Sequence, residues 1–176
     1  MKNYLVANYI YDLPFGKGKY LLSNSSGIVD KLVSGWQFAG IATFASGSYF
    51  SVTFNSMLTG WRSGRANIVG DPWNSRQNQY QWFNPAAFAV PAPYTFGNSA
   101  PASLQGPGSI SWDTAFFKHT GLTERLNLEI RVEAFNILNH ANLGNPGTNI
   151  SVPASVGVIT LRNGSRVMQF GARLTF

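Results

Sequence analysis

The sequence predicts an all-β fold: an antiparallel meander forming about the last five strands of a transmembrane β-barrel, with long extracellular loops. Two rows of alternating residues, few charges and many aromatic side chains predict it. Only 11% of the 176 residues are charged, whereas about 25% is usual in a soluble domain. Aromatic residues make up 14%. Part of this protein is therefore expected to face something other than water.

The chain has no run of about 20 apolar residues, the length that a helix needs to cross a bilayer. In lipid, each backbone N–H and C=O group needs a partner within the protein, and closed barrels are the other structure that supplies one. If this chain spans a membrane, it must therefore do so with strands.

The clearest expected strand covers residues 126–135. Its even positions are aliphatic up to Ala134, and its odd positions are polar or charged up to Glu133. This period of two predicts a strand with one apolar face. A half-buried strand of a soluble protein has the same pattern, so this segment alone favours a barrel only slightly.

The last residues repeat the alternation. Met168, Phe170, Ala172, Leu174 and Phe176 occupy every second position. Terminal residues usually fray into water, so a soluble chain seldom ends on an exposed aromatic side chain. The pattern indicates a strand that lies against lipid; the alternative is an edge strand tucked into the core of a sandwich.

Three earlier strands are expected at residues 3–12, 33–54 and 112–119. The second should bend at Ser46 and Gly47 and then continue its outward-facing row. That continuation would consist of Phe50, Val52 and Phe54. In the third, Trp112, Thr114 and Phe116 should face outward.

Placing Phe176 at the periplasmic rim fixes the direction of every strand. The connections at about 55–111 and 139–164 are then extracellular loops, and those at about 13–32 and 120–123 are periplasmic turns. Long loops on one side and short turns on the other are typical of outer-membrane barrels. Within the first loop, Asn84 and Pro85 predict a capped helical turn over residues 86–88.

Five stretches of the sequence resemble the TonB-dependent outer-membrane receptors, in particular the Oar-like group with a carboxypeptidase-regulatory-like domain. They are residues 11–18, 35–40, 82–88, 131–140 and 169–176. The resemblance implies a barrel of about 22 strands, an N-terminal plug in its lumen, and contact with TonB through that plug. About five strands cannot close such a barrel, so this chain is expected to be a C-terminal part of one, without the plug.

The resemblance also implies a role for the last strand as the signal for the barrel-assembly machinery. The residues that would carry this signal are Met168, Phe170, Leu174 and Phe176. The partners expected for the whole protein are outer-membrane lipid, the rest of the barrel with its plug, TonB, the assembly machinery and an extracellular solute.

Charged residues on the inward face are candidates for contact with the plug. They are Asp113, Glu129, Arg131, Glu133 and Arg173. Two interpretations stay open: a network that rearranges during transport, or the solvated lining of a polar lumen.

The long loop at 55–111 is the best candidate for ligand binding, because it combines flat apolar rings with polar groups. The expected ligand residues are Trp61, Arg62, Arg65, Trp73, Tyr80, Trp82 and Phe83. The same aromatic side chains could instead pack against one another to hold the loop together.

Other functional classes find little support. The chain has no cysteine, and its two histidines, His119 and His140, form no catalytic or metal-binding pattern with the seven acidic residues. Despite the net charge of +6, the basic residues are scattered, which argues against nucleic acid. We therefore expect no enzyme activity, no cofactor and no metal, and a location in the bacterial outer membrane. The alternative is a secreted soluble β-sandwich that binds carbohydrate.

Overall fold

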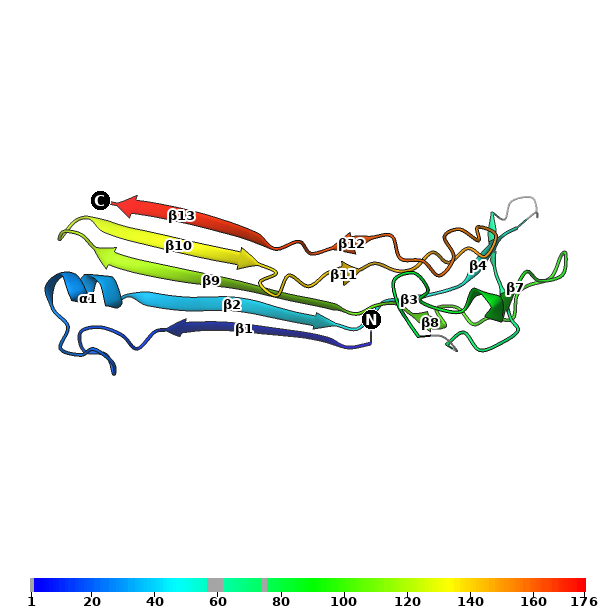
Figure 1. Ribbon diagram of the computed structural model, residues 1–176, viewed down its shortest axis with the longest axis horizontal. Helices are drawn as coiled ribbons and strands as arrows, with labels where there is room; N and C mark the ends of the chain where they lie inside the picture. Colours follow the sequence, from blue (N-terminus) through cyan, green and yellow to red (C-terminus); the bar gives the residue numbers. More distant parts are fainter. Residues whose placement is uncertain (1, 57–61, 74–75) are drawn as a thin grey trace. The chain divides into compact units, whose positions relative to one another are not determined.

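A computed structural model describes residues 2–56, 62–73 and 76–176 of the chain (Figure 1). The contacts divide these residues into two compact units. The sheet unit contains Leu5–Phe44, Ile110–His140 and Gly164–Phe176, and the loop unit contains Met1–Tyr4, Ala45–Ser109 and Ala141–Asn163. Each unit is described separately.

The sheet unit is built on one five-stranded sheet in the order β1-β2-β9-β10-β13. Successive strands alternate in direction (Figure 1). The strands are β1 (Tyr4–Asp12), β2 (Trp36–Ala45), β9 (Ser109–Gly121), β10 (Asn127–Phe135) and β13 (Val167–Thr175). The expected antiparallel meander is confirmed. Strands β1 and β13 are its two edges, so the described sheet is open and does not close into a barrel.

The register between strands gives the sheet two chemically different faces. Val132 lies opposite Phe170 on β13 and Phe116 on β9. Side chains directly opposite each other share a face, so the aliphatic rows of neighbouring strands coincide. The apolar face comprises Leu128, Ile130, Val132, Ala134, Phe116, Met168, Phe170, Ala172 and Leu174. The polar face comprises Asp113, His119, Glu129, Arg131, Glu133, Gln169 and Arg173.

Most side chains of the apolar face are exposed, although Ala134 is buried. Ile130 has 43% of its surface accessible, and Phe170 has 72%. Burying an apolar side chain of this size typically stabilises a protein by about 1.5–3 kcal/mol, so a water-soluble protein would cover such a row. The exposure contradicts the sandwich alternative, in which a second sheet would bury residues 126–134.

Aromatic rings extend the apolar face over β1 and β2. Phe38 stacks on Phe116 with ring centroids 4.6 Å apart, and Tyr9 lies 5.1 Å from Phe38. The indole N–H of Trp112 donates a hydrogen bond of 2.8 Å to the hydroxyl of Tyr9. Trp112 and Phe116, which the sequence predicts to face outward, both belong to this face.

One charged residue, Lys118, lies on the apolar face near the end of β9. Its ammonium group donates hydrogen bonds to the carbonyl oxygens of Ser34 and His119, and lies 5.8 Å from the centre of the Trp36 ring. The long stem covers apolar surface while the charge reaches polar groups at the sheet's end. Lys118 can therefore lie on the apolar face without leaving its charge in apolar surroundings.

The connection between β1 and β2 contains a short helix that the sequence analysis missed, α1 (Gly27–Val33). The carboxylate of Asp30 accepts hydrogen bonds of 2.8 Å from the backbone N–H of Lys17 and from the hydroxyl of Ser25. These bonds tie the helix to the preceding loop. Neither described helix has the length and apolar character needed to cross a membrane.

The loop unit consists of short strand pairs. They are β3 (Tyr49–Phe50) with β8 (Leu104–Gln105), β4 (Thr53–Asn55) with β5 (Ser63–Arg65), β6 (Asn67–Ile68) with β7 (Phe88–Ala89), and β11 (Asn142–Leu143) with β12 (Arg162–Asn163). A 3-10 helix, η1 (Pro85–Ala87), precedes β7. The side chain of Asn84 accepts a hydrogen bond of 3.2 Å from the backbone N–H of Ala86, so the predicted cap is confirmed, although the turn ends before Phe88.

The loop unit has its own hydrophobic core. Rings from distant parts of the chain meet there: Phe83 lies 5.8 Å from Phe50 and 5.7 Å from Phe88. The buried cluster consists of Phe50, Val52, Ala66, Phe83, Ala87, Phe88, Leu104 and Val156. The two predicted extracellular loops are therefore folded together, since this core draws on both.

The predicted outward continuation of the second strand is wrong. Strand β2 ends at Ala45, and Val52 is fully buried in the loop unit. The chain turns away at Gly47, where a Cβ atom would lie 1.8 Å from the carbonyl oxygen of Gly106. Only glycine permits this close approach of two backbones.

Candidate functional site

Two cavities in the loop unit are lined by residues of the predicted ligand-binding loop. The first, called pocket A, has a volume of about 600 Å³. Its walls come from Phe54, Asn55 and Ser56, from β5, and from residues 90–97. The second, pocket B, has a volume of about 360 Å³. It is lined by Tyr49, Trp73, Gln77, Trp82, Ser103, Gln105 and Gly106.

The structure distributes the predicted ligand residues over different environments. Arg65 lines pocket A, and Trp73 and Trp82 line pocket B. Arg62 is exposed, and Tyr80 is 75% exposed without lining either cavity. Trp61 lies outside the described residues.

Phe83 differs from its predicted role. It is 0% exposed and occupies the centre of the core, so its ring packs against protein. Trp82 also packs against the core, and its indole N–H donates a hydrogen bond of 2.9 Å to the carbonyl oxygen of Gln105. The packing interpretation therefore holds for Phe83, while the rings of Trp73 and Trp82 line pocket B.

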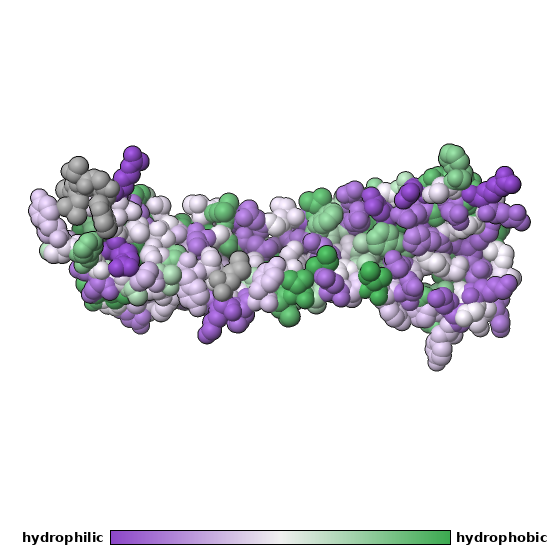
Figure 2. All heavy atoms as spheres, turned by 180° about the vertical axis from the view of Figure 1, so that it is seen from behind, coloured by the Kyte–Doolittle hydropathy of each residue, from purple (hydrophilic) through white to green (hydrophobic). Residues whose placement is uncertain are grey.

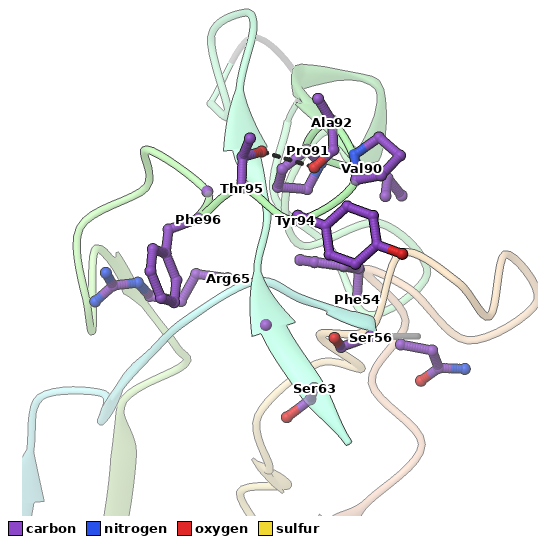
Figure 3. Close-up of a pocket in the computed structure, with 14 residues that line it drawn as sticks. Phe54, Ser56, Ser63, Arg65, Val90, Pro91, Ala92, Tyr94, Thr95 and Phe96 are labelled. Carbon is purple, nitrogen blue, oxygen red and sulfur yellow. Dashed lines mark hydrogen bonds between the residues drawn. The ribbon is translucent and has the colours of Figure 1, made fainter. Parts of the chain in front are cut away.

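Pocket A also contains residues that are not among the seven expected ligand residues. Figure 3 shows the ring of Tyr94 close to that of Phe54, with Val90 and Pro91 beside them. The signal in the sequence was the pair Pro91 and Pro93 directly before Tyr94, because proline restricts the backbone and presents neighbouring side chains in a fixed direction.

The loop unit carries most of the net positive charge of the chain, although it holds five of the 13 basic residues. Its basic residues are Lys2, Arg62, Arg65, Arg76 and Arg162, and its one acidic residue is Asp71. Five positive charges and one negative charge leave +4, out of +6 for the whole chain. An excess of this kind attracts anions to the surface of the unit.

The polar face of the sheet brings together the residues predicted to face inward. Arg173 lies opposite Glu129, and Arg131 lies 3.8 Å from Glu133. His119 lies 3.7 Å from Glu129 on its other side. Asp113 is engaged differently, because it accepts a hydrogen bond from the backbone N–H of Asn136.

The residues predicted to carry the assembly signal share the edge strand or follow it. Met168, Phe170 and Leu174 lie on β13, on the apolar face and exposed, and Phe176 follows its end. Within the described ranges, no three His, Asp or Glu side chains are grouped in a way that could hold a metal ion.

Figure 2 shows hydrophobic and hydrophilic residues interspersed over one face of the molecule, as expected of a surface that is not uniformly covered by charge.

Comparison with known proteins gives a consistent assignment. Residues 1–169 match the family described as "Outer membrane beta barrel domain". No curated protein and no solved structure matches the chain. The chain thus belongs to the outer membrane beta barrel domain family, and its five-stranded sheet is part of a barrel in the bacterial outer membrane.

Proposed function

We propose that this chain is the C-terminal part of a TonB-dependent receptor of the Oar-like group, which captures a large solute at the cell surface and passes it through the barrel. The solute is a carbohydrate or a peptide. The proposed activity is to bind the solute and release it without forming a covalent bond, so neither enzyme activity nor a cofactor is involved.

The observation that carries this proposal is the separation of charge between the two faces of the sheet. Glu129, Arg131 and Glu133 alternate with aliphatic residues that face the other way. A lumen lined with ionisable groups is a water-filled or plug-filled passage, whereas small barrels fill their interior with packed side chains. This supports a wide barrel with room for a plug and a solute.

The two open edges of the sheet support the same view. Edge strands expose unpaired N–H and C=O groups, which cost several kcal/mol each in lipid. Strands β1 and β13 therefore need further strands of the same barrel as partners. The assembly machinery would use the exposed apolar row of β13 to place that edge.

The folded loop unit supports capture of a solute. It offers two cavities, exposed aromatic rings and excess positive charge. A long loop with its own core holds these groups in fixed positions, which lowers the entropic cost of binding.

Photo-crosslinking tests the proposal in the full-length protein. A photoreactive amino acid at Arg131 is expected to crosslink to an N-terminal plug of the same polypeptide, and the yield should change when TonB is deleted. The matched control is Ile130, one residue away on the other face, which should crosslink to lipid. The proposal would be contradicted if the protein with the photoreactive residue at 131 gave no crosslink to the plug. It would also be contradicted if the crosslinking yield were the same with and without TonB.

A further inference from the structure

Helix α1, in the connection between β1 and β2, exposes an apolar stripe. Ile28, Val29 and Leu32 are 79%, 58% and 65% exposed. Given the helical period of 3.6, these three positions lie within one arc of about 100°, and Asp30 and Lys31 lie outside it. No residue of the helix is buried. A grouped set of exposed apolar side chains indicates a surface that something apolar covers.

The C-terminal turn of α1 is bonded to the apolar face of the sheet. The indole N–H of Trp36 donates a hydrogen bond of 3.0 Å to the carbonyl oxygen of Leu32. Trp36 lies two positions before Phe38 on β2, and Phe38 stacks on Phe116, a member of the apolar face. Side chains two positions apart on a strand share a face, so Trp36 belongs to the apolar face as well.

Two further side chains of this face hold the same end of the helix. The hydroxyl of Thr120, which lies opposite Leu128, donates a hydrogen bond of 3.4 Å to the carbonyl oxygen of Lys31. The ammonium group of Lys118 donates to the carbonyl oxygen of Ser34. Carbonyl groups at the end of a helix have no partner within it, so these bonds fix the helix in place. Helix α1 is thus attached to the side of the sheet that meets lipid in a barrel, and not to the lumen side.

Trp36 and Lys118 also indicate the depth of α1 in the bilayer. Tryptophan is enriched where acyl chains meet headgroups, and a lysine near the end of a membrane strand reaches toward the same level. Helix α1 directly precedes β2, at the end of the sheet with the shorter connections (Figure 1). Outer-membrane barrels turn their short connections to the periplasm, so this level is that of the periplasmic leaflet.

The charges at this end of the sheet unit are positive in sum. The basic residues are Lys17, Lys19, Lys31, Lys118 and Arg125, and the acidic ones are Asp12, Asp30 and Glu124. Five positive charges and three negative charges leave +2. Lys17 and Lys19 are exposed in the connection that carries α1. Exposed lysines beside an apolar stripe are typical of helices that lie in the surface of a membrane with anionic lipids.

We propose that α1 is an interfacial helix that binds phospholipids of the periplasmic leaflet. Ile28, Val29 and Leu32 insert among the upper parts of the acyl chains, and Lys17 and Lys19 contact the phosphates of anionic headgroups. The surface continues the apolar face of the sheet, so one layer of lipid covers both. This inference goes beyond the proposed function, because it requires a barrel in a membrane but neither a solute nor a plug.

Quenching by brominated lipid tests the insertion of α1. The full-length protein, with any cysteine outside this chain replaced, receives a single cysteine by Ile28→Cys and a bimane label there. It is placed in vesicles of phosphatidylcholine brominated near the top of the acyl chains. Glu124→Cys is the matched control, because Glu124 is exposed in the connection between β9 and β10 at the same end of the sheet.

We expect quenching at position 28 to be at least about twofold stronger than at position 124, because an interfacial helix buries its apolar side at the boundary of headgroups and acyl chains. A label at Leu32→Cys should behave like that at Ile28→Cys, since both side chains belong to the stripe. Equal quenching of all three labels would show that water or protein, and not lipid, covers α1, and would overturn the proposal.

A second measurement tests the headgroup. Vesicles contain equal amounts of phosphatidylglycerol, which is anionic, and phosphatidylcholine, and only one of the two lipids is brominated. The label at position 28 should be quenched about twofold more strongly by brominated phosphatidylglycerol, because lysines near the surface attract anionic lipid. Lys17→Gln combined with Lys19→Gln should remove this preference.

Arg76→Gln combined with Arg162→Gln is the control for charge, because it removes two exposed positive charges from the loop unit instead. This control should keep the preference. Equal quenching by the two lipids, or a preference that survives the lysine substitutions, would overturn the assignment of anionic headgroups to Lys17 and Lys19. Neither measurement involves TonB, a plug or a solute, so a failure of the receptor proposal leaves this inference standing, and the reverse also holds.

Discussion

Asp113 on β9 accepts a hydrogen bond of 2.8 Å from the backbone N–H of Asn136, the first residue after β10. The amide of Asn136 in turn donates to the carbonyl oxygens of His140 and Gly164, and its oxygen accepts from the N–H of His140. Asn136 is buried and has a φ of 50°. Asn136 thus links β9 through its backbone N–H, and links the end of β10 to the segment before β13 through its side chain.

Asn136→Ala is expected to destabilise the protein by about 2–4 kcal/mol, because it removes several buried hydrogen bonds and leaves carbonyl groups without partners. The midpoint of urea unfolding in lipid vesicles measures the loss. Asn139→Ala is the control: Asn139 also has a φ of 50°, but its side chain makes one exposed hydrogen bond, to Arg166. If both substitutions lowered the unfolding midpoint equally, the hydrogen bonds of the Asn136 side chain would contribute no stability beyond that of the backbone conformation.

Gly40→Ala should be costly. A Cβ atom there would lie 2.4 Å from the Tyr9 hydroxyl and 2.6 Å from the carbonyl oxygen of Asp113. Tyr9 would have to move and lose its hydrogen bond with Trp112, at a cost of about 1–3 kcal/mol. Gly171→Ala is the control, because its nearest neighbour is the flexible side chain of Arg131 at 2.9 Å. The same unfolding measurement should show little change for the control, and a tolerated Gly40→Ala would contradict the packing described.

Phe83→Ala should unfold the loop unit while the sheet survives. Replacing a fully buried phenylalanine costs about 3–5 kcal/mol, and this ring lies at the centre of the core. Limited trypsin digestion of the embedded protein should then cleave within the loop unit, at Arg62, Arg65 or Arg76. Tyr80→Ala, an exposed aromatic control, should resist cleavage as the unaltered protein does. Equal resistance of Phe83→Ala would show that this core is not what holds the loops.

Acid should loosen the connection between β1 and β2. The hydrogen bond from the backbone N–H of Lys17, followed by that from Ser25, lowers the pKa of Asp30 below its usual value of 3.8. A lowered pKa stabilises the folded connection fully above 3.8, and this contribution is lost as the pH falls through the folded-state pKa. Exchange of the Lys17 amide hydrogen should therefore gain protection as the pH rises through this range. In Asp30→Asn the protection should not depend on pH; an equal dependence in both proteins would exclude Asp30 as the cause.

The sequence predicts the sheet well because its signal is local. The alternation in residues 126–134 and 168–176 directly specifies which side chains share a face, and the register of β10 places both rows together. The cap at Asn84 was predictable for the same reason, since the interacting groups are two residues apart.

The loop unit was not predictable in the same way. Its core joins Phe50, Phe83, Leu104 and Val156, which no periodic pattern links. An aromatic side chain in a loop has the same identity whether it binds a ligand or packs inside, so Phe83 and Trp73 could not be distinguished from composition. The helix α1 escaped notice because its apolar residues are exposed and it spans 7 residues, too few to show a helical period.

The central claim is that the apolar face of the sheet touches hydrocarbon while the polar face touches an aqueous lumen. The chain contains no cysteine, so single cysteines can be introduced at each position from 128 to 133 and spin-labelled without interference. Collision rates with oxygen, which concentrates in lipid, and with a water-soluble nickel chelate are measured by electron paramagnetic resonance in lipid vesicles. We expect oxygen to dominate at 128, 130 and 132, and nickel at 129, 131 and 133. Rates that do not alternate, or that alternate in the opposite phase, would contradict the account.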